Sequence, residues 1–402
     1  MRTTDGDWRS AIHLLAQIER PSASDGERRA AEWISARLRA LGCDARVEQE
    51  RAHGGYWLPI GLANGLAAGS GALALVRPNR RARALAVGAG AVAAAALWDD
   101  LGHGRRWFRA LLPHRPTWNV VAEAGDRGAQ RTVVLVAHHD AAHSGLVFHP
   151  ALGRLGPRFA PRLHERSGQT VPILYAVWLG PVLVCAAAVL GNRRLLRAGL
   201  ALALGAIAAM ADIAGRRVVP GANDNLSAVG VLLAIAASLR DRPVTGLRVL
   251  LVSTGSEESF SEGMQAFGRR HFPHLDRART AFVCLECLGG PSLIVLEGEG
   301  MLRMRDYPAQ TREALAAAAA DAGVTAQRGL RTVAATDGLI ALRAGYEVAT
   351  LASVDYTKLP LNYHWPSDRA DALCWETIED AIAVCDRFLR REAERSSLTS
   401  VH

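Results

Sequence analysis

Continuous apolar runs alternate with helical patterns along most of this chain of 402 residues. The segments 131–139, 245–255 and 279–289 contain such runs, which are typical of strands buried on both faces of a mixed or parallel sheet. Apolar residues recur at helical spacing near 26–41 and 227–239. Strands that alternate with helices predict a three-layer α/β/α sandwich built on a mixed, mostly parallel sheet.

Two insertions interrupt this pattern, and each consists of two apolar segments joined by an arginine-rich link. A hydrocarbon core requires about 20 apolar residues per helix, and three of the four segments approach that length. The second segment is short. We therefore predict two inserted helical hairpins in a membrane, formed by the apolar segments 56–76, 84–98, 171–191 and 198–215. The alternative is that they are apolar helices of a large soluble core or of a dimer face.

Composition narrows the possible partners. The net charge of +8 comes almost wholly from arginine, because Lys358 is the single lysine. No dense basic run is interleaved with aromatic residues, so we expect no nucleic-acid binding. The six cysteines are scattered and indicate no disulfide framework. Cys284 and Cys287 form a C-x-x-C on an apolar strand without a partner pair, and we predict that both are buried thiols.

Carboxylate and imidazole side chains recur in five short motifs, each placed where a strand is predicted to end. Imidazole nitrogen and carboxylate oxygen are ligands that paired Zn²⁺ ions prefer, with one position left open for water. An ordered set of this kind is hard to obtain by chance. The motifs AHHD, GANDN, SEES, CLECLGG and NYHWPSD supply His138, Asp140, Asp224, Glu257, Glu258, Glu286 and His364.

The spacing within the motifs separates ligands from supporting groups. Adjacent residues on an extended chain point to opposite sides, so Glu257 and Glu258 are not expected to share a metal. One of them can coordinate a metal while its neighbour takes a proton from water. His138 and Asp140 are two residues apart and share a face, so Asp140 can orient the imidazole. The predicted ligands are His138, Asp224, Glu258, Glu286 and His364, with Glu257 as the base.

These motifs resemble those of the M28 zinc peptidases, which include bacterial leucyl aminopeptidases and glutamate carboxypeptidase. The resemblance covers the helix near 26–41 and the stretches around 115–143 and 218–390, and Asp337-Gly338 also fits the family pattern. It implies a zinc-exopeptidase-like fold, a peptide substrate and a co-catalytic pair of Zn²⁺ ions. One ion would be held by His138, Asp224 and Glu286, and the other by Asp224, Glu258 and His364.

The same resemblance implies the remaining roles and contains one departure. Glu257 would be the general base of an aminopeptidase-like hydrolase, and Asp140 would support His138. The family usually has Asp where this chain has Glu286. Glutamate is an equally good oxygen ligand with a longer reach, so we expect metal binding to persist. A substrate preference carried over from aminopeptidases is less secure for that reason.

The hairpins leave three stretches for the catalytic domain, namely 1–55, 99–170 and 216–402, with the hairpins themselves at 56–98 and 171–215. Arginines lie at both ends of the hairpins, so the positive-inside rule does not choose a side. The polar N-terminal segment lacks the apolar stretch of a signal peptide. It would nevertheless have to cross the membrane if the catalytic domain lay outside the cytoplasm. This favours a cytoplasmic catalytic domain in a multi-pass membrane protein that contacts lipid.

Two other functions fit parts of the pattern. A single-zinc acyl-transfer enzyme resembling the glutaminyl cyclases shares the fold, and a binding module on an inactive peptidase fold is the second alternative. Retention of both His138 and Glu286 argues against the first, and retention of Glu257 argues against the second. Four further polar residues are expected in loops or at the surface: His139, His143, His149 and Glu262.

Overall fold

A seven-stranded sheet forms the centre of the globular part of the computed structural model, which describes residues 7–399. The strand order is β1-β2-β4-β3-β5-β10-β6. The four neighbours β4, β3, β5 and β10 are parallel, whereas β1, β2 and β6 join through antiparallel pairs. The strands are β1 (Asp44–Ala52), β2 (Arg115–Gly125), β3 (Thr132–His138), β4 (Arg248–Thr254), β5 (Thr280–Glu286), β6 (Ser292–Val295) and β10 (Glu347–Val354). A small second sheet contains β7 (Gly298–Glu299), β8 (Arg305–Asp306) and β9 (Arg331–Thr332).

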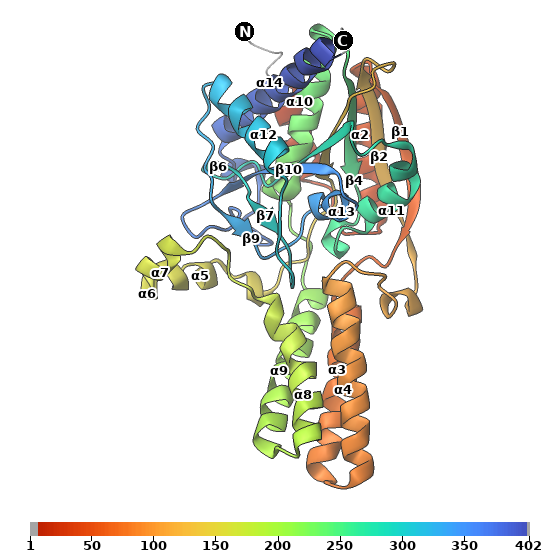
Figure 1. Ribbon diagram of the computed structural model, residues 1–402, viewed down its shortest axis with the longest axis vertical. Coiled ribbons are helices and arrows are strands. Elements are labelled where there is room, and N and C mark those ends of the chain that lie inside the picture. Colours follow the sequence, from red (N-terminus) through yellow and green to blue (C-terminus); the bar gives the residue numbers. More distant parts are fainter. Residues whose placement is uncertain (1–6, 400–402) are drawn as a thin grey trace.

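Helices cover both faces of the large sheet, which confirms the predicted α/β sandwich (Figure 1). Along β3, Val133 and Leu135 enter one core while Val134 and Val136 enter the other, the alternation expected of a strand. The first core is covered by α1 (Asp7–Leu15), α2 (Asp25–Ala40), α10 (Ser227–Asp241), α12 (Ala309–Asp321) and α14 (Trp375–Thr399). The second is covered by α11 (Glu262–His271) and α13 (Gly338–Arg343).

Short helical elements connect the larger ones. Those between β3 and the second insertion are α5 (Pro150–Gly153), α6 (Leu155–Phe159) and α7 (Pro161–Arg166). The remaining turns are η1 (Arg109–Leu111), η2 (Leu146–Phe148), η3 (Ala222–Leu226), η4 (Glu257–Ser259), η5 (Phe272–His274) and η6 (Ala370–Ala372).

Four long apolar helices form a stalk that extends away from the sheet (Figure 1). Each of them packs against two or three of the others. The stalk consists of α3 (Trp57–Val76), α4 (Arg80–Leu101), α8 (Leu174–Leu190) and α9 (Arg193–Gly215). The helix α4 starts at Arg80, so it is longer than the predicted apolar segment, whereas α8 is shorter than its segment. Of the arginines in the first link, Arg80, Arg81 and Arg83 belong to the first turn of α4, whereas Arg77 caps the end of α3.

Among residues 7–399, four helical stretches are long and apolar enough to cross a membrane, namely α3, α4, α9 and Ala222–Asp241. The last of these is 94% buried inside the globular part, where it packs on the sheet as α10, whereas the window in α9 is only 28% buried. Burial therefore separates the core helix from the stalk. A helix of 20 residues such as α3 is about 30 Å long, close to the thickness of a hydrocarbon core.

Small residues allow the stalk helices to approach closely. A Cβ atom at Gly199 of α9 would lie 2.8 Å from the backbone nitrogen of Val184 in α8. Gly180 of α8 faces Ala203 of α9 in the same way, with its Cβ position 2.8 Å from the Ala203 nitrogen. Close backbone approach of this kind supports helix packing by van der Waals contact. The interface between α8 and α9 therefore depends on glycine at these positions.

We predict that Gly199→Leu destabilises the stalk, whereas Gly205→Leu on the same helix does not. A leucine at Gly199 must displace the α8 backbone, at a cost of about 1–3 kcal/mol or more. Apart from the two chain neighbours and the nearby backbone of α9 itself, no atom of residues 7–399 lies within 4 Å of a Cβ at Gly205. Both changes alter helix propensity equally, so thermal unfolding in detergent isolates the packing effect. Equal melting temperatures for the two variants would contradict the predicted interface.

Candidate metal centre

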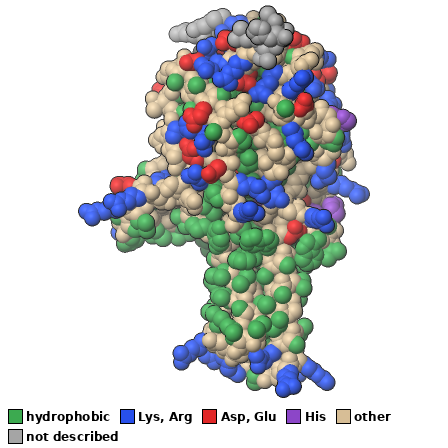
Figure 2. Space-filling view, viewed as in Figure 1, with side chains coloured by type: hydrophobic (Ala, Val, Ile, Leu, Met, Phe, Trp, Pro, Cys, Tyr) green, Lys and Arg blue, Asp and Glu red, His purple; other side chains and the backbone are tan. Residues whose placement is uncertain are grey.

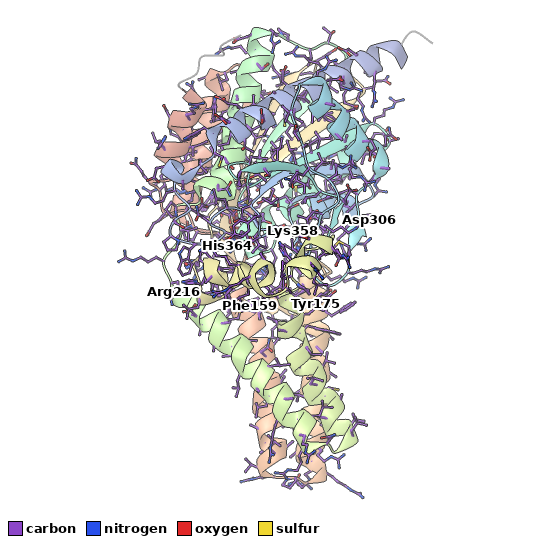
Figure 3. The ribbon with its side chains drawn as sticks, turned by 90° about the vertical axis from the view of Figure 1, so that its left-hand side faces the viewer. Phe159, Tyr175, Arg216, Asp306, Lys358 and His364 are labelled. Atoms are coloured by element: carbon purple, nitrogen blue, oxygen red, sulfur yellow. The ribbon has the colours of Figure 1, made fainter. Side chains whose placement is uncertain are left out.

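The carboxyl ends of three parallel strands bring polar side chains to one edge of the sheet. His138 is the last residue of β3 and pairs in register with Thr254 at the end of β4. Glu286 ends β5, and Glu257 and Glu258 follow β4 in the turn η4. Crevices outside the carboxyl ends of parallel strands are where such sheets place their sites. Figure 3 places His364 at the end of the globular part that adjoins the stalk.

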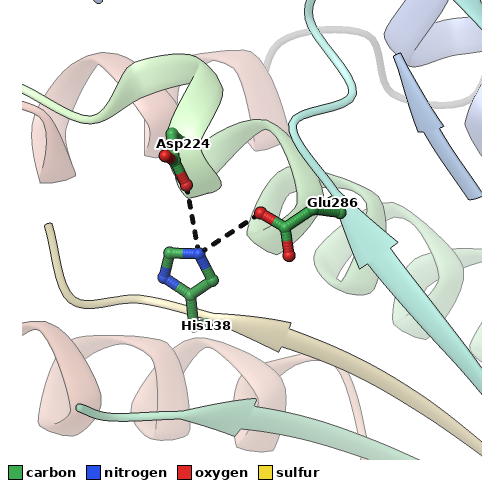
Figure 4. A group of neighbouring side chains, drawn as sticks. All are labelled: His138, Asp224 and Glu286. Atoms are coloured by element: carbon green, nitrogen blue, oxygen red, sulfur yellow. Dashed lines mark ion pairs between the residues drawn. The ribbon is translucent and has the colours of Figure 1, made fainter. Parts of the chain in front are cut away.

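Asp224 lies between two histidines and presents a different oxygen to each. Its Oδ1 is 3.1 Å from His138 Nε2, and its Oδ2 is 3.2 Å from His364 Nε2. Glu286 approaches the first histidine, with Oε1 3.5 Å from His138 Nε2 (Figure 4). Glu258 approaches the second, with Oε2 3.1 Å from His364 Nε2. Asp224 thus belongs to two groups of three potential ligands.

The sequence-predicted ligands therefore meet, although they come from five separate segments. In the groups that could hold a metal ion, ligand atoms lie within 4.8 Å of one another. One group is His138, Asp224 and Glu286, and another is Asp224, Glu258 and His364. A third contains Glu257 with His138 and Glu258, so the predicted base lies beside the ligands. The Oε2 atom of Glu257 is 3.9 Å from His138 Nε2.

Burial makes this concentration of acids costly without a cation. His138, Asp224 and His364 are almost fully buried. Burial and the nearby Asp224 raise the pKa of Glu258 to about 6, although His364 opposes the shift. Burial also raises the pKa of Glu257 well above its usual value, and Asp337 and Glu286 add to this. A bound cation would offset this repulsion between carboxylates.

Buried polar atoms without a hydrogen-bond partner also indicate a site for a cation. Within the described chain, Glu258 Oε1 and His364 Nδ1 are buried side-chain atoms without a hydrogen-bond partner. Buried polar atoms of this kind are uncommon in folded proteins and call for a compensating group. The donor set consists of imidazole nitrogens and carboxylate oxygens, which Zn²⁺ accepts. The residues at this edge of the sheet therefore fit zinc.

Comparison with known proteins agrees with this geometry. Residues 207–389 match the model of Peptidase family M28. The matched region contains Asp224, Glu258, Glu286 and His364, while His138 lies before it. No curated protein matches the chain.

Solved structures share the fold of this chain. An aminopeptidase from Aneurinibacillus sp. strain AM-1 is 12% identical with a TM-score of 0.55, and the alignment covers 95% of this chain and 92% of that chain. A glutaminyl cyclase from Tannerella forsythia is 13% identical with a TM-score of 0.55, covering 97% and 99%. BSAP, a zinc aminopeptidase from Bacillus subtilis, is 13% identical with a TM-score of 0.53, covering 96% and 94%. At these identities the likeness establishes the fold alone.

Asp140 connects His138 to the glutamate turn, which is η4 with Glu257 and Glu258. Its Oδ1 lies 3.4 Å from His138 Nδ1, and its backbone oxygen lies 3.2 Å from the same nitrogen. The carboxylate also accepts hydrogen bonds from the backbone N–H groups of Glu257 and Glu258, at 3.0 and 3.1 Å. Ser22 donates a further hydrogen bond to it at 2.6 Å. Asp140 therefore orients three site residues and leaves His138 Nε2 free to face a metal.

Two buried residues that sequence reasoning missed fix the turn that carries Asp224. Asp368 accepts hydrogen bonds from the backbone N–H groups of Asn223 and Asp224, at 2.6 and 3.1 Å. Arg20 donates to the carbonyl oxygens of Pro220 and Gly221, at 2.6 and 2.7 Å. Asp368 follows His364 in NYHWPSD, which was a usable signal. No local pattern distinguishes Arg20 from the many exposed arginines.

Two further acids surround the glutamate turn. Glu27 on α2 accepts hydrogen bonds from the N–H and hydroxyl of Ser256, directly before Glu257, at 3.1 and 3.0 Å. Burial raises the pKa of Glu27 to about 8, and the nearby Asp140 adds to the shift. Asp337 is hydrogen-bonded to Thr254 at the end of β4, and burial raises its pKa to about 7. Helical periodicity in the sequence predicted α2, but it could not show that Glu27 reaches the edge of the sheet where the predicted ligands lie.

The predicted solvent exposure of Glu262 was wrong, whereas His139 lies in the loop after β3, one of the two predicted settings, but is buried there. His139 is fully buried with Nδ1 2.9 Å from Ser253 Oγ, and burial lowers its pKa to about 3. Glu262 is also buried. Burial alone would raise the pKa of Glu262, but His53 and Arg109 outweigh this and lower it to about 2. His143 is partly exposed and His149 is exposed. The prediction for Cys284 and Cys287 is confirmed, because both are free and buried.

A buried ion pair ties the end of stalk helix α4 to the glutamate turn. Arg109 Nε and Nη2 each lie 2.8 Å from an oxygen of Asp100 in α4. Arg109 Nη1 donates to the carbonyl oxygen of Ser259 at 3.0 Å, and Arg106 donates to that of Phe260. Because Ser259 directly follows Glu258, the position of a predicted ligand is linked to the base of the stalk.

We predict that Arg109→Met destabilises the protein by about 3–5 kcal/mol. The change removes the guanidinium that binds the Asp100 carboxylate and leaves a negative charge buried. The matched control is Arg127→Met, which breaks an exposed pair with Asp44. An exposed ion pair contributes little to stability, so this control should unfold like the parent protein. Thermal unfolding in detergent measures both. An Arg109 variant as stable as the control would show that the buried pair does not hold the turn.

Proposed function

We propose that this chain is a membrane-anchored, zinc-dependent peptidase that acts as an exopeptidase with Glu257 as its general base. The match of residues 207–389 to the model of Peptidase family M28 supports hydrolase activity. The observation that carries the proposal is the placement of Asp224, whose two oxygens face His138 and His364 at 3.1 and 3.2 Å. A carboxylate shared in this way is what a pair of co-catalytic ions requires.

The residues divide into two metal sites. His138, Asp224 and Glu286 would hold one Zn²⁺, and Asp224, Glu258 and His364 would hold the other. Zinc at these positions supplies Lewis acidity, which polarises a scissile carbonyl and lowers the pKa of bound water. Asp140 and Asp368 keep the ligands in place through the hydrogen bonds described above.

Glu257 is suited to move a proton because its carboxylate lies beside the ligands. Ser261 Oγ donates to Glu257 Oε1 at 3.2 Å, and the backbone N–H is held by Asp140. In the proposed reaction Glu257 accepts a proton from the attacking water and returns it to the leaving amine. Glu258 is turned toward His364 instead, so the neighbouring acids divide the two tasks.

Membrane anchorage follows from the stalk. Its helices expose large apolar side chains, among them Leu62, Leu85 and Leu204, at 46%, 52% and 51% of their surface. Hydrophobic side chains cover the stalk in a continuous belt, and basic side chains lie at its far end (Figure 2). Such a belt flanked by arginines is typical of helices in a bilayer. A multi-pass protein with a cytoplasmic catalytic domain remains our proposal for its location.

The site would lie close to the lipid surface, because the second hairpin is inserted between two predicted ligands. The chain leaves after His138 and re-enters before Asp224 through two segments that pair in an isolated bridge between His143 and Val218. Ser144 N donates to Arg217 O at 3.0 Å, and Val219 N donates to Ala142 O at 2.9 Å. We therefore propose short peptides or membrane-proximal chain ends as substrates. We propose cleavage from the N-terminal end, because aminopeptidases are among the similar structures.

Glutaminyl cyclase activity is the second candidate, because two kinds of enzyme occur among the similar structures. Cyclisation of an N-terminal glutamine releases ammonia and leaves the peptide whole, whereas hydrolysis adds water and divides it. The two complete ligand groups around Asp224 favour hydrolysis. Digestion of a peptide library by the zinc-loaded protein, read by mass spectrometry, distinguishes shortened peptides from ones that have lost only ammonia.

We predict that Glu257→Gln keeps the metal content of the protein and lowers peptide turnover on the order of a hundredfold or more, because an amide cannot accept the proton. The matched control is Glu376→Gln on α14, an exposed acid that belongs to none of the ligand groups, which should leave turnover unchanged. Steady-state kinetics and metal analysis measure the two effects. Unchanged turnover, or loss of metal from the Glu257 variant, would reject the assigned role.

A further inference from the structure

A short helical arm, defined as residues 150–166, projects sideways from the boundary between the stalk and the globular part (Figure 1). It comprises α5, α6 and α7 and belongs to the connection between β3 and the second hairpin. Each residue of the arm is exposed or partly exposed, and none is buried. The arm therefore contributes nothing to the cores of the globular part, although it contains large apolar side chains.

Apolar and basic residues alternate along the three short helices of the arm. Arginines occur at every fourth position, and large apolar residues occupy neighbouring positions. The arginines are Arg154, Arg158, Arg162 and Arg166, and the apolar residues are Leu152, Leu155, Phe159 and Leu163. Phe159 and Leu163 are each 72% exposed. Exposed apolar clusters rimmed by polar residues mark interaction sites.

The position of the arm identifies the partner. In Figure 2 hydrophobic side chains cover the underside of the arm and are continuous with the belt of the stalk, while basic side chains project from its outer end. Figure 3 shows Phe159, Tyr175 and Arg216 at a similar height, where the stalk meets the globular part. For a stalk that spans a bilayer, this height is the boundary between acyl chains and headgroups.

We propose that the arm lies in the membrane surface, with its apolar side chains at the acyl boundary and its arginines on the phosphates of anionic phospholipids. Amphipathic helices rich in arginine bind membrane interfaces in this way, and long basic side chains extend toward the headgroups. The proposal rests on the membrane anchorage proposed above and adds a second contact with lipid outside the spanning helices.

Charge favours lipid over protein as the occupant. The arm carries four arginines and a single acid, Glu165. A second copy of the chain would oppose these arginines with its own, which is unfavourable. An anionic leaflet instead attracts basic residues by about 1 kcal/mol each near its surface. The arm is also continuous with the apolar belt of the stalk, so one bilayer covers both.

The inner side of the arm is fixed to the loop that carries His364. Lys358 Nζ donates to the carbonyl oxygen of Ser167 at 2.7 Å, directly after the arm. His164 Nε2 lies 3.0 Å from the carbonyl oxygen of Tyr356. Just before the arm, the ring of Phe148 packs edge-on against His364, with centroids 4.5 Å apart. A membrane-bound arm would therefore hold the His364 loop, and with it the metal centre, next to the lipid surface.

Depth-dependent fluorescence quenching in proteoliposomes tests the proposal on the full chain. Cys185 and Cys374 are the partly exposed cysteines and are replaced by serine, because the other four are buried. A polarity-sensitive thiol dye is then attached to Ala160→Cys in the arm, Leu204→Cys in the stalk or Glu394→Cys on α14. Ala160 and Glu394 are exposed, and α14 ends far from the stalk (Figure 1). The liposomes contain phosphatidylglycerol and lipids with a quencher on the acyl chain.

We expect at least twofold quenching at positions 160 and 204 and none at 394. The paired change Arg158→Gln and Arg162→Gln, or replacement of phosphatidylglycerol by phosphatidylcholine, should reduce quenching at 160 and leave that at 204 unchanged.

Quenching at 204 without quenching at 160 would overturn the arm proposal and leave the anchorage intact. Quenching at neither position would reject the anchorage itself. Shielding at 160 that depends on protein density and not on lipid would indicate a second copy and would also overturn the proposal. Quenching at 160 that is insensitive to both arginines and lipid charge would overturn the assignment of phosphate as the partner.

Discussion

The sharing of one buried carboxylate between two imidazoles is the constraint on which the site depends. Asp224 meets His138 and His364 with different oxygens, so each neighbour must approach from its own side. Glu286 approaches His138, and Glu258 approaches His364. Several acids close together in a buried site repel one another, and this repulsion has to be balanced by a cation and by hydrogen bonds.

The surrounding fold supplies those hydrogen bonds from distant segments. Asp140 and Asp368 bind backbone N–H groups of the glutamate turn and of the turn around Asp224. Glu27 reaches the same edge of the sheet from α2 and holds Ser256. The stalk takes part as well, because Asp100 at the end of α4 binds Arg109, which in turn holds Ser259. The metal centre, the sheet and the base of the stalk thus form one connected set of polar contacts.

Much of this could be predicted from the sequence because the signals are local. Apolar runs ended at His138 and Glu286, and parallel strands bring such ends together. Other features depend on contacts between segments far apart in the chain. His139 and Glu262 look like loop residues, and only the packing of β4 and of the loop after β1 buries them. Hydropathy also misplaced the start of α4, because Arg80 and Arg81 form its first turn, whereas the apolar segment starts only at 84.

The most direct test of the central claim is anomalous X-ray scattering at the zinc edge from crystals of the detergent-solubilised protein. We predict two peaks for each chain, one on either side of the Asp224 carboxylate. The first should lie next to His138 and Glu286, and the second next to His364 and Glu258. A single peak that contacts only one histidine, with no second peak at saturating zinc, would contradict the account.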